Sequence, residues 1–397
     1  MRILFVCEGF DRYSIRAQPW KHVFEIAHRM KTSGNEVSIL TNKNSLFPEE
    51  EILAGMRVRR ISKRRFLFNA DELTEALNDN HELINWNASG VLSALHFTRT
   101  KKVQPTLIWT LHSGLVEYSD FKNLKLADIL SLGRFWNNIL YSVRPSAFIR
   151  KAISLTNLKI ITLSERLRKH LLGLGIEERR IRVIYSGVDT NRFFPKHQKE
   201  VEKNREELHL SPSDKIVLYY GPMNPFRGAD ELISAMPSVL SSCPDSRFIF
   251  LGRVTRRDIS SSLLKKHLIR HKRAVLVEGV QSQEVIAQYL SIADVVVLPF
   301  RFWPYVECPL TVLETMAAGK PVITSRIGAI PEIVQDDKTG LLVTPRRETI
   351  SSAILMILRN RNLAERLGQN ARKYVEKFHS WDYITRKTRE TFQQWLA

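Results

Sequence analysis

Hydrophobic positions cluster in short runs along the whole chain. These runs are rich in Val, Ile and Leu, the pattern of strands buried on both faces, and they alternate with longer amphipathic stretches. In the first half the predicted strands lie at residues 2–7, 36–41, 56–61, 106–111, 158–162 and 182–184. In the second half they lie at residues 215–220, 247–251, 274–278, 294–299 and 321–324.

The stretches between these runs have helical periodicity. Trp20, Val23 and Phe24 share one face of a helix predicted over residues 18–33, and Gly34 ends it. Ser164 is a typical N-cap for a further helix. Other helices are predicted at residues 228–240, 283–291 and 309–318.

Alternating strands and helices in both halves predict an α/β protein with two doubly wound parallel sheets. A polar, charged stretch at residues 195–212 interrupts the pattern and is interpreted as the linker between them. We therefore expect one Rossmann-like domain over residues 1–190 and another over residues 191–379. Ligands bind such sheets at the carboxyl ends of the strands, so the cleft between the two domains is the expected active site.

Charge adds a possible class of partner. The chain has 60 Lys and Arg against 41 Asp and Glu, a net charge of +19. The excess is spread evenly, because residues 1–190 carry 29 basic and 19 acidic groups and residues 191–397 carry 31 and 22. Such a field favours a lipid surface, a phosphorylated substrate or nucleic acid, and generic solubility is the alternative.

Cysteine use and hydropathy indicate a compartment. Cys7, Cys243 and Cys308 are odd in number and far apart, which fits a reducing environment and argues against a disulfide framework or a zinc site. The first apolar run is too short for a signal peptide and is interpreted as a buried strand. No run approaches the roughly 18–20 apolar residues of a membrane span, so a cytoplasmic location is expected.

The most informative segment follows the strand at residues 294–299. Pro309 suits the first position of a helix, and the amides of Leu310 and Thr311 would then point out of its positive end at the edge of the sheet. Such a helix start binds phosphate groups well. The segment therefore predicts a diphosphate site.

Two carboxylates flank this helix start. Glu307 and Glu314 could each accept hydrogen bonds from neighbouring hydroxyls, as the sugar and ribose of a nucleotide sugar present them. The alternative is that Glu307 only caps the helix and Glu314 faces solvent.

Three further loops place candidate residues at strand ends. The loop from Gly221 to Gly228 delivers Arg227, a suitable partner for a diphosphate and its leaving group. His112 follows the strand at residues 106–111 and would face the cleft, and Gly9 follows the first strand. Each has a plain alternative: a solvated Arg, an ordinary His at a strand end, and a single glycine that is no dinucleotide fingerprint.

Several motifs, taken together, resemble the GT4-type family of retaining glycosyltransferases, group 1, with the GT-B fold. The matching segments, in chain order, are residues 184–195 (IYSGVDTNRFFP), 221–228 (GPMNPFRG), 307–321, 328–333, 339–343 (TGLLV) and 378–382 (FHSWD). The resemblance covers nearly the whole chain and is strongest from residue 180 to residue 345.

This resemblance implies roles for the candidate residues. Glu314 would bind the ribose hydroxyls, Glu307 the donor hexose and Arg227 the diphosphate, with His112 touching the transferred sugar. Anomeric configuration would be retained, with the leaving phosphate helping to deprotonate the acceptor and no metal or cofactor needed. The C-terminal helix, residues 380–397, would cross back and complete the N-terminal, acceptor-side domain.

The resemblance is imperfect at two positions. The two glutamates are seven positions apart where the family has eight, so that Val306 occupies the strict position. Pro222 stands where the family often has Arg, and Arg301 or Arg326 are the candidates to replace that charge.

The implied donor is a UDP- or GDP-sugar, and the implied acceptor is a glycan or a lipid-linked molecule. Residues 121–157 mix aromatic and basic side chains, and residues 57–65 form a basic run, so we expect peripheral binding to the inner face of an anionic membrane. A buried core helix beside a solvated strand end is the alternative. Other functions left open are a nucleotide-sugar epimerase of the same fold and a catalytically degenerate basic binding protein, whereas no nucleic-acid module is present.

Overall fold

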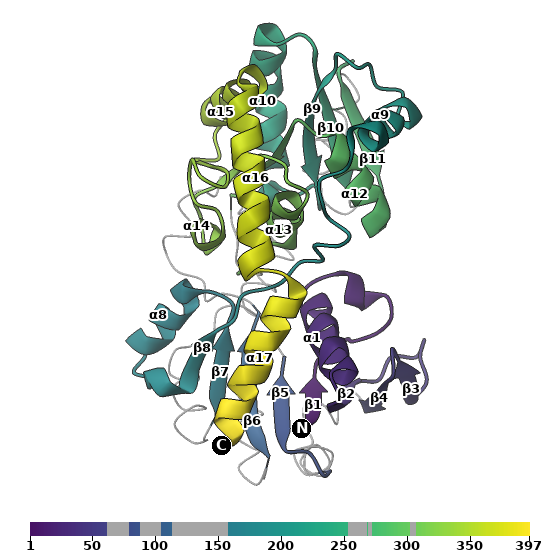
Figure 1. Ribbon diagram of the computed structural model, residues 1–397, viewed down its shortest axis with the longest axis vertical. Coiled ribbons are helices and arrows are strands. Elements are labelled where there is room, and N and C mark those ends of the chain that lie inside the picture. Colours follow the sequence, from purple (N-terminus) through teal and green to yellow (C-terminus); the bar gives the residue numbers. More distant parts are fainter. Residues whose placement is uncertain (62–78, 88–104, 113–157, 253–267, 269–271, 302–306) are drawn as a thin grey trace.

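The computed structural model contains two parallel sheets, one above the other, each flanked by helices (Figure 1). It describes the chain except for residues 62–78, 88–104, 113–157, 253–267, 269–271 and 302–306. The predicted membrane segment, residues 121–157, therefore lies outside the described residues. Of the basic run at residues 57–65, only residues 57–61 are described.

The N-terminal sheet has eight strands in the order β3-β4-β2-β1-β5-β6-β7-β8. Neighbouring strands are parallel except β3 and β4, which form an antiparallel pair at one edge. The strands are β1 (Arg2–Val6), β2 (Glu36–Asn42), β3 (Glu50–Leu53), β4 (Met56–Ile61), β5 (Leu83–Trp86), β6 (Thr106–Leu111), β7 (Lys159–Thr162) and β8 (Ile181–Val183).

The C-terminal sheet has six parallel strands in the order β11-β10-β9-β12-β13-β14. The strands are β9 (Lys215–Tyr220), β10 (Ser246–Gly252), β11 (Ala274–Glu278), β12 (Val295–Leu298), β13 (Val322–Ser325) and β14 (Leu341–Val343). Both sheets thus have the doubly wound character that the alternating pattern predicts.

Helices cover both faces of each sheet because successive strand residues point to opposite sides. In the upper sheet, Leu218 packs with helices α12 (Gln283–Ile292), α13 (Leu310–Ala317) and α16 (Arg361–Phe378), whereas Val217 packs with α10 (Ala229–Ser242) and α15 (Arg347–Arg359). In the lower sheet, α1 (Trp20–Thr32) and α17 (Trp381–Leu396) cover one face, and α8 (Glu165–Gly173) contributes to the core of the other.

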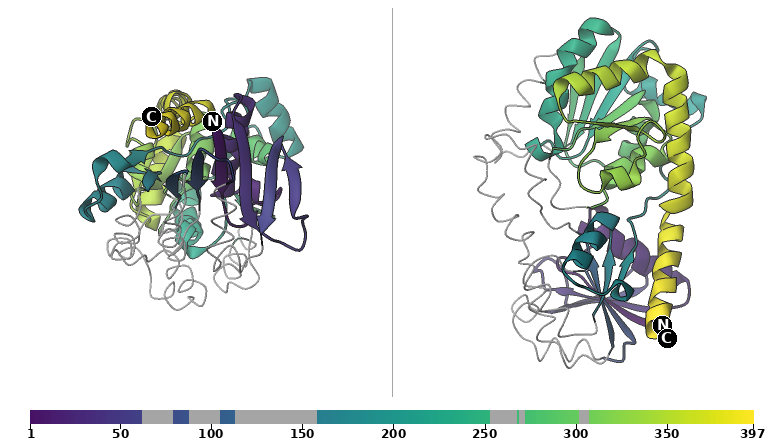
Figure 2. Two further views of the ribbon diagram at one scale, coloured as in Figure 1. Left: turned by 90° about the horizontal axis from the view of Figure 1, so that it is seen from below. Right: turned by 90° about the vertical axis from the view of Figure 1, so that its left-hand side faces the viewer.

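The last two helices connect the two sheets. Helix α16 packs against α13 in the upper part, and α17 continues downward to pack against α1, bringing the C-terminus close to the N-terminus (Figure 2). A turn at His379 and Ser380 separates the two helices, and Ser380 pairs with Val188 in an isolated parallel bridge. The chain therefore passes between the upper and lower parts twice, near Val188 and near His379.

The predicted linker is wrong in part, because residues 195–212 contain helix α9 (Gln198–Glu207). Its sequence is polar on nearly every side, which hides it from a periodicity argument. The helix is held at the surface of the sheet by a hydrogen bond of 2.9 Å from Asn204 to Ser291 and by packing of Val201 on the core. The connection thus contributes to the C-terminal part.

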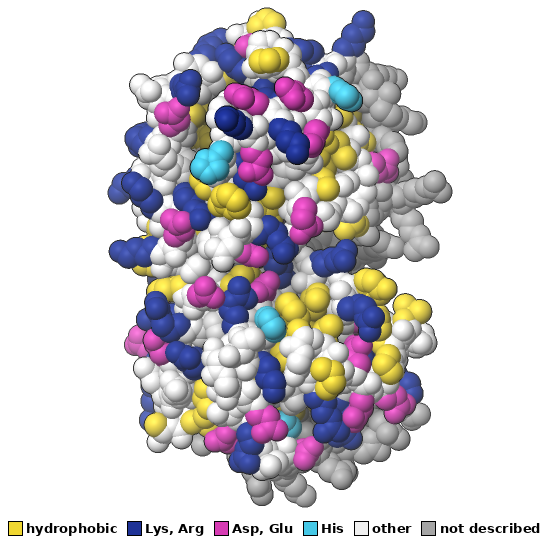
Figure 3. All heavy atoms as spheres, turned by 45° about the vertical axis from the view of Figure 1, so that its right-hand side comes forward, with side chains coloured by type: hydrophobic (Ala, Val, Ile, Leu, Met, Phe, Trp, Pro, Cys, Tyr) yellow, Lys and Arg dark blue, Asp and Glu magenta, His cyan; other side chains and the backbone are white. Residues whose placement is uncertain are grey.

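Basic side chains are distributed as the sequence indicates. On the face shown in Figure 3, Lys and Arg side chains lie over both the upper and lower parts and alternate with Asp and Glu. Of the described helices, none combines the length and the apolar character that a membrane crossing requires.

Gly187 marks the tightest contact where the chain crosses between the two sheets. A Cβ atom at this position would lie 2.4 Å from a ring carbon of Trp381, a side chain only 1% exposed. We expect Gly187→Ala to lower the free energy of unfolding by about 1–3 kcal/mol, because the buried indole must shift. Urea denaturation measures this change.

Gly173→Ala is the matched control, because Gly173 lies in helix α8 and a Cβ there meets no atom within 4 Å. Alanine favours a helix, so this variant should be neutral or gain up to about 1 kcal/mol. Equal stability of the two variants would contradict the packing described at Trp381.

Candidate functional site

The site is built where the N-terminus of α13 faces the N-terminus of α1. Glu314 lies one turn into α13 and is 6% exposed, so it does not face solvent. Its Oε1 lies 3.6 Å from the Nζ of Lys21, which comes from the first turn of α1. Its Oε2 lies 3.4 Å from the hydroxyl of Tyr220 at the end of β9. Burial raises the pKa of Glu314, and the ammonium of Lys21 opposes that shift.

The start of α13 offers backbone donors. The amides of Val312 and Leu313 bond the carbonyl of Pro309, at 3.1 and 3.3 Å. In the part of the chain that the structure describes, no acceptor is bonded to the amides of Leu310 and Thr311. The sequence prediction placed a diphosphate at these two amides, and they have the free donors it needs.

The loop after β9 lies beside this helix start. Gly221 has φ +126°, a conformation that favours glycine, and a Cβ there would approach the methyl group of Thr311 at 4.0 Å. Tyr219 fixes the loop from below, because its hydroxyl donates a hydrogen bond of 2.8 Å to the carbonyl of Pro222. Gly221 and Thr311, which are 90 positions apart in the chain, therefore share one edge of the sheet.

Arg227 is delivered by the short 3-10 helix that ends this loop, residues Pro225–Arg227. Its backbone amide donates to the side-chain oxygen of Asn224 at 3.1 Å, and its guanidinium lies over the ring of Phe300 at 5.1 Å from the centroid. Burial lowers the pKa of Arg227 to about 10, so it stays a cation at neutral pH. Phe300 follows β12, so Arg227 lies over the same sheet edge.

The two suggested replacement cations are engaged elsewhere. Arg301 is 1% exposed and forms an ion pair of 3.1 Å with Asp230 at the start of α10. Arg326 is largely exposed and pairs with Asp336. The backbone amide of Arg301 bonds the carbonyl of Phe226 in the loop that carries Arg227, at 2.9 Å, and the substitution of either cation for the charge missing at Pro222 stays a prediction.

Glu307 reaches across to the N-terminal part instead of capping α13. Its Oε2 accepts a hydrogen bond of 2.7 Å from the hydroxyl of Ser164, and its Oε1 lies 3.8 Å from Arg166. Ser164 also accepts a bond of 3.0 Å from the amide of Leu167, which confirms it as the N-cap of α8. Glu307 is 1% exposed and so is part of the contact between the two sheets.

Glu332 strengthens the same contact, and sequence reasoning assigned it no role. Its carboxylate accepts hydrogen bonds of 2.7 and 2.8 Å from the amides of Glu165 and Arg166, at the start of α8, and one of 3.0 Å from the hydroxyl of Tyr185. A carboxylate at a helix N-terminus is favoured by the helix dipole. Its presence in a Pro-Glu-Ile motif was the only signal in the sequence.

His112 lies at the carboxyl end of β6 and is 5% exposed. Its Nε2 is 2.8 Å from the side-chain oxygen of Asn87, which in turn is bonded to Asn85. Asn85 lies in β5 and Asn87 follows it. The sequence pattern missed this strand. The two asparagines orient the imidazole and were not predicted as part of the site.

His22 extends this cluster toward the C-terminal helix. Its ring packs edge-on against His112, with centroids 4.9 Å apart, and against Trp381 at 5.8 Å. Burial lowers the pKa of His22 to about 3, so the ring is neutral. His379, whose Nδ1 donates to the carbonyl of Ser186 at 3.1 Å, is also neutral, because burial lowers its pKa to about 4.

These neutral histidines make stability depend on pH. Below about pH 6.5 an unfolded histidine takes up a proton that the buried ring refuses until about pH 4 in the case of His379, so acid favours unfolding. For one such histidine, the free energy of unfolding should fall by about 2 kcal/mol between pH 7 and pH 5. In the His379→Gln variant the free energy of unfolding should fall less between pH 7 and pH 5. Urea denaturation at both pH values measures the difference. Identical pH profiles for the variant and the unchanged protein would contradict a neutral, buried His379.

Gly9 contributes to the shape of the loop after β1. Its φ is +72°, its amide donates to the side-chain oxygen of Asn42 at 2.6 Å, and it lies against the indole of Trp20. The amide is thus bonded to the last residue of β2, and the predicted contact of Gly9 with a ligand stays a prediction. Among the described residues, no cluster of His, Cys, Asp and Glu is suited to hold a metal ion.

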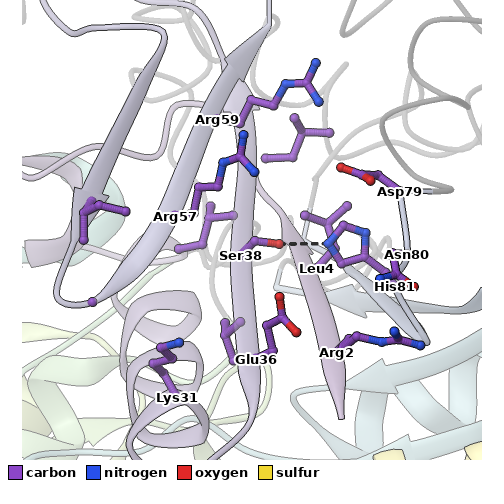
Figure 4. A pocket seen from close by; sticks show the side chains of 15 residues that line it. Arg2, Leu4, Lys31, Glu36, Ser38, Arg57, Arg59, Asp79, Asn80 and His81 are labelled. Atoms are coloured by element: carbon purple, nitrogen blue, oxygen red, sulfur yellow. Dashed lines mark hydrogen bonds between the residues drawn. The ribbon is translucent and has the colours of Figure 1, made fainter.

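A cavity of about 330 Å³ lies at a different place, on the N-terminal sheet (Figure 4). It is lined by charges of both signs, including Arg57, Arg59 and Asp79, and by Ser38, whose hydroxyl is 3.0 Å from Nε2 of His81. Most of these residues lie near the amino ends of the strands, whereas ligands of such sheets bind at the carboxyl ends. None of the predicted site residues lines this cavity, so we place the site between the sheets.

Comparison with known families gives two matches that divide the chain. A model described as "Glycosyl transferases group 1" matches residues 200–374. A model described as "Glycosyltransferase Family 4" matches residues 20–192. The two regions meet near residue 195 and together span most of the chain.

Individual proteins agree with these models. An uncharacterized glycosyltransferase of Methanocaldococcus jannaschii is 26% identical over 385 residues, which is 92% of this chain and 92% of that protein. A sucrose-phosphate synthase of Thermosynechococcus elongatus superposes with a TM-score of 0.75 at 20% identity, over 99% of this chain and 98% of the other. HepE of Anabaena, in complex with UDP and glucose, superposes with a TM-score of 0.72 at 16% identity, over 99% of each chain. These structural likenesses concern the fold.

Proposed function

The chain belongs to the GT4-type, group 1 glycosyltransferases and has their GT-B fold, and from this premise we propose that it transfers a hexose from a nucleoside diphosphate sugar to an acceptor. The nucleotide sugar lies between the two sheets. A UDP-sugar is the first donor to consider, because the HepE structure of the same fold holds UDP, and a GDP-sugar is the other.

The observation that carries this proposal is the convergence at the start of α13. The amides of Leu310 and Thr311, the loop at Gly221 and the cation of Arg227 lie at one sheet edge. Backbone donors at a positive helix end, with a guanidinium nearby, match a diphosphate in geometry and in charge. Glu314, one turn further along, is proposed to accept hydrogen bonds from the ribose hydroxyls.

The proposed reaction depends on the negative charge that these groups can stabilise. As the bond between the sugar and the diphosphate breaks, negative charge grows on the departing phosphate, and Arg227 and the helix start stabilise it. A phosphate oxygen then takes the proton of the acceptor hydroxyl, which attacks from the same face of the sugar and retains its configuration. His112, held by Asn87, contacts the transferred sugar, and no metal takes part.

Glu307 has the role of contacting the donor hexose in this proposal. In the structure its carboxylate is bonded to Ser164 of the opposite part, so it must share or exchange that bond when the sugar enters. A carboxylate oxygen can accept more than one hydrogen bond, so a hydroxyl of the sugar can be added while the contacts of Glu307 with Ser164 and Arg166 persist.

The acceptor is proposed to bind on the N-terminal side. Residues 1–190, completed by the C-terminal helix, form the acceptor domain, and residues 191–379 form the nucleotide-sugar domain. A glycan or lipid-linked acceptor at an anionic membrane surface fits the net charge of +19. Flotation with anionic liposomes at low salt tests this part, and absence of binding would refute it.

A donor screen tests the activity itself. The purified protein is mixed with a panel of UDP- and GDP-sugars, with and without EDTA, and thermal shift and release of nucleoside diphosphate are recorded. We expect one donor to raise the melting temperature and to be hydrolysed slowly, without effect of EDTA, and NMR of the glycosylated product to show the anomeric configuration of the donor. An altered free sugar formed without acceptor would instead indicate an epimerase, and no response to any donor would indicate a binding protein.

A further inference from the structure

Lys21 is a buried cation with few polar partners among the described residues. Its side chain is 3% exposed, and it forms an ion pair with Glu314, 3.6 Å away. Among the described residues its ammonium makes no hydrogen bond, although such a group has three donors. Buried charges are normally paired and hydrogen-bonded, because desolvated donors without acceptors cost free energy. The ammonium of Lys21 therefore has donors for which the described residues supply no acceptor.

Lys21 lies within reach of the proposed diphosphate position. Leu310 packs among the residues around α1, which places the starts of α1 and α13 against each other. Glu314 follows Leu310 by four residues, or about 6 Å along the helix axis. A lysine stem is long and flexible enough to cover that distance. The ammonium of Lys21 can thus reach the phosphates proposed to lie at the amides of Leu310 and Thr311.

The balance of charges at the site favours movement of the Lys21 ammonium toward the phosphates. The loop between Gly221 and Gly228 carries one cation, Arg227, and Arg301 is already paired with Asp230. If the ribose hydroxyls donate hydrogen bonds to the carboxylate of Glu314, they compete with the ammonium of Lys21 for it at the moment when the negative diphosphate arrives. Both changes favour transfer of the ammonium from the carboxylate to the phosphates.

We propose that Lys21 is a phosphate ligand of the nucleotide-sugar site: its ammonium, which pairs with Glu314 in the structure, binds the diphosphate when the donor enters. This inference rests on the proposed function and adds to it a residue from the N-terminal sheet. It also makes donor binding depend on the approach of the two sheets, since α1 carries the ligand.

The test separates contact with phosphate from contact with Glu314. Binding of UDP, GDP, uridine and guanosine to the full chain is measured by ligand-observed NMR titration, which detects weak nucleoside binding. Lys21→Met should weaken binding of the nucleoside diphosphate at least tenfold. Binding of the nucleoside should be unchanged or slightly tighter. Lys21→Arg should keep diphosphate affinity within about threefold, because the charge remains.

Two controls guard the result. Lys31→Met, in the last turn of the same helix, should change neither affinity, and thermal melting shows whether each variant is folded. In the Glu314→Gln background Lys21 has no ion pair to lose. If Lys21 contacts phosphate, Lys21→Met should still weaken binding of the nucleoside diphosphate at least tenfold there. An equal loss for diphosphate and nucleoside, or no loss in that background, would show that Lys21 serves only Glu314. Failure of the unchanged protein to bind any nucleotide would overturn the proposed function as well.

Discussion

Replacing Arg227 by Met is expected to lower kcat/KM for the donor by about a hundredfold to a thousandfold. Removal of one fixed donor that stabilises charge in a transition state costs about this much in other enzymes. Arg227 is suited to this role because burial lowers its pKa only to about 10, and because Phe300 supports its guanidinium at 5.1 Å. The effect should fall mainly on kcat, since negative charge on the leaving group increases as the bond breaks.

The measurement is the initial rate of nucleoside diphosphate release with the donor found in the screen. Arg227→Lys should recover part of the loss, because lysine keeps the charge but not the two-pronged hydrogen bonding of the guanidinium. Arg361→Met, an exposed position on α16 paired with Glu365, is the control and should act like the unchanged protein. A change of less than threefold in Arg227→Met would place the diphosphate elsewhere.

Replacing Glu314 by Gln is expected to weaken donor binding by about tenfold to a hundredfold. Hydrogen bonds to a charged group contribute about 1.5–3 kcal/mol, and the amide keeps the shape but loses the charge. KM should rise more than kcat falls, because the ribose contact exists before and during the reaction. Calorimetry of UDP or GDP binding measures the effect directly.

The pH dependence of this binding gives a second readout. Burial raises the pKa of Glu314, so donor affinity should begin to fall, on acidification, at a higher pH than an exposed glutamate would cause. Glu314→Gln should remove that part of the pH dependence. Glu348→Gln, at an exposed position of α15, is the control and should leave affinity and its pH profile unchanged. Normal affinity in Glu314→Gln would contradict the assignment of the ribose site.

The alternation of strands and helices could be predicted from the sequence because both sheets are parallel and buried. The predicted central strands, such as β9 and β12, have a mostly apolar and buried run at their centre. Strand β5 was missed because it has only four residues and carries Asn85 in its middle, and β3 because it is an exposed edge hairpin with two glutamates. Helix α9 was missed because a polar surface helix lacks an apolar stripe.

The part of the candidate site that lies at the strand ends of the C-terminal sheet could be predicted from the sequence. Arg227, Leu310 and Glu314 all follow from the rule that ligands bind at the carboxyl ends of parallel strands. Asn85 and Asn87 were missed together with β5, and the other missed residues depend on how the two sheets face each other. Lys21 meets Glu314, and Glu332 meets the start of α8, across the contact between the sheets. No local pattern records contacts of this kind.

The contact between the sheets also involves the first of the two glutamates. Glu307 accepts a hydrogen bond from Ser164, the N-cap of α8. Its carboxylate is therefore bonded from the opposite side of the site. That Glu307 takes the role of the family's first glutamate, despite the one-residue difference in spacing, stays a prediction.

A crystal structure of this protein with UDP, or with GDP if the screen selects it, is the most direct test of the account. The two phosphates should lie within hydrogen-bonding distance of the amides of Leu310 and Thr311, with the guanidinium of Arg227 beside them. Phosphates bound elsewhere, for example among Arg57 and Arg59 on the N-terminal sheet, with the start of α13 unoccupied, would contradict it.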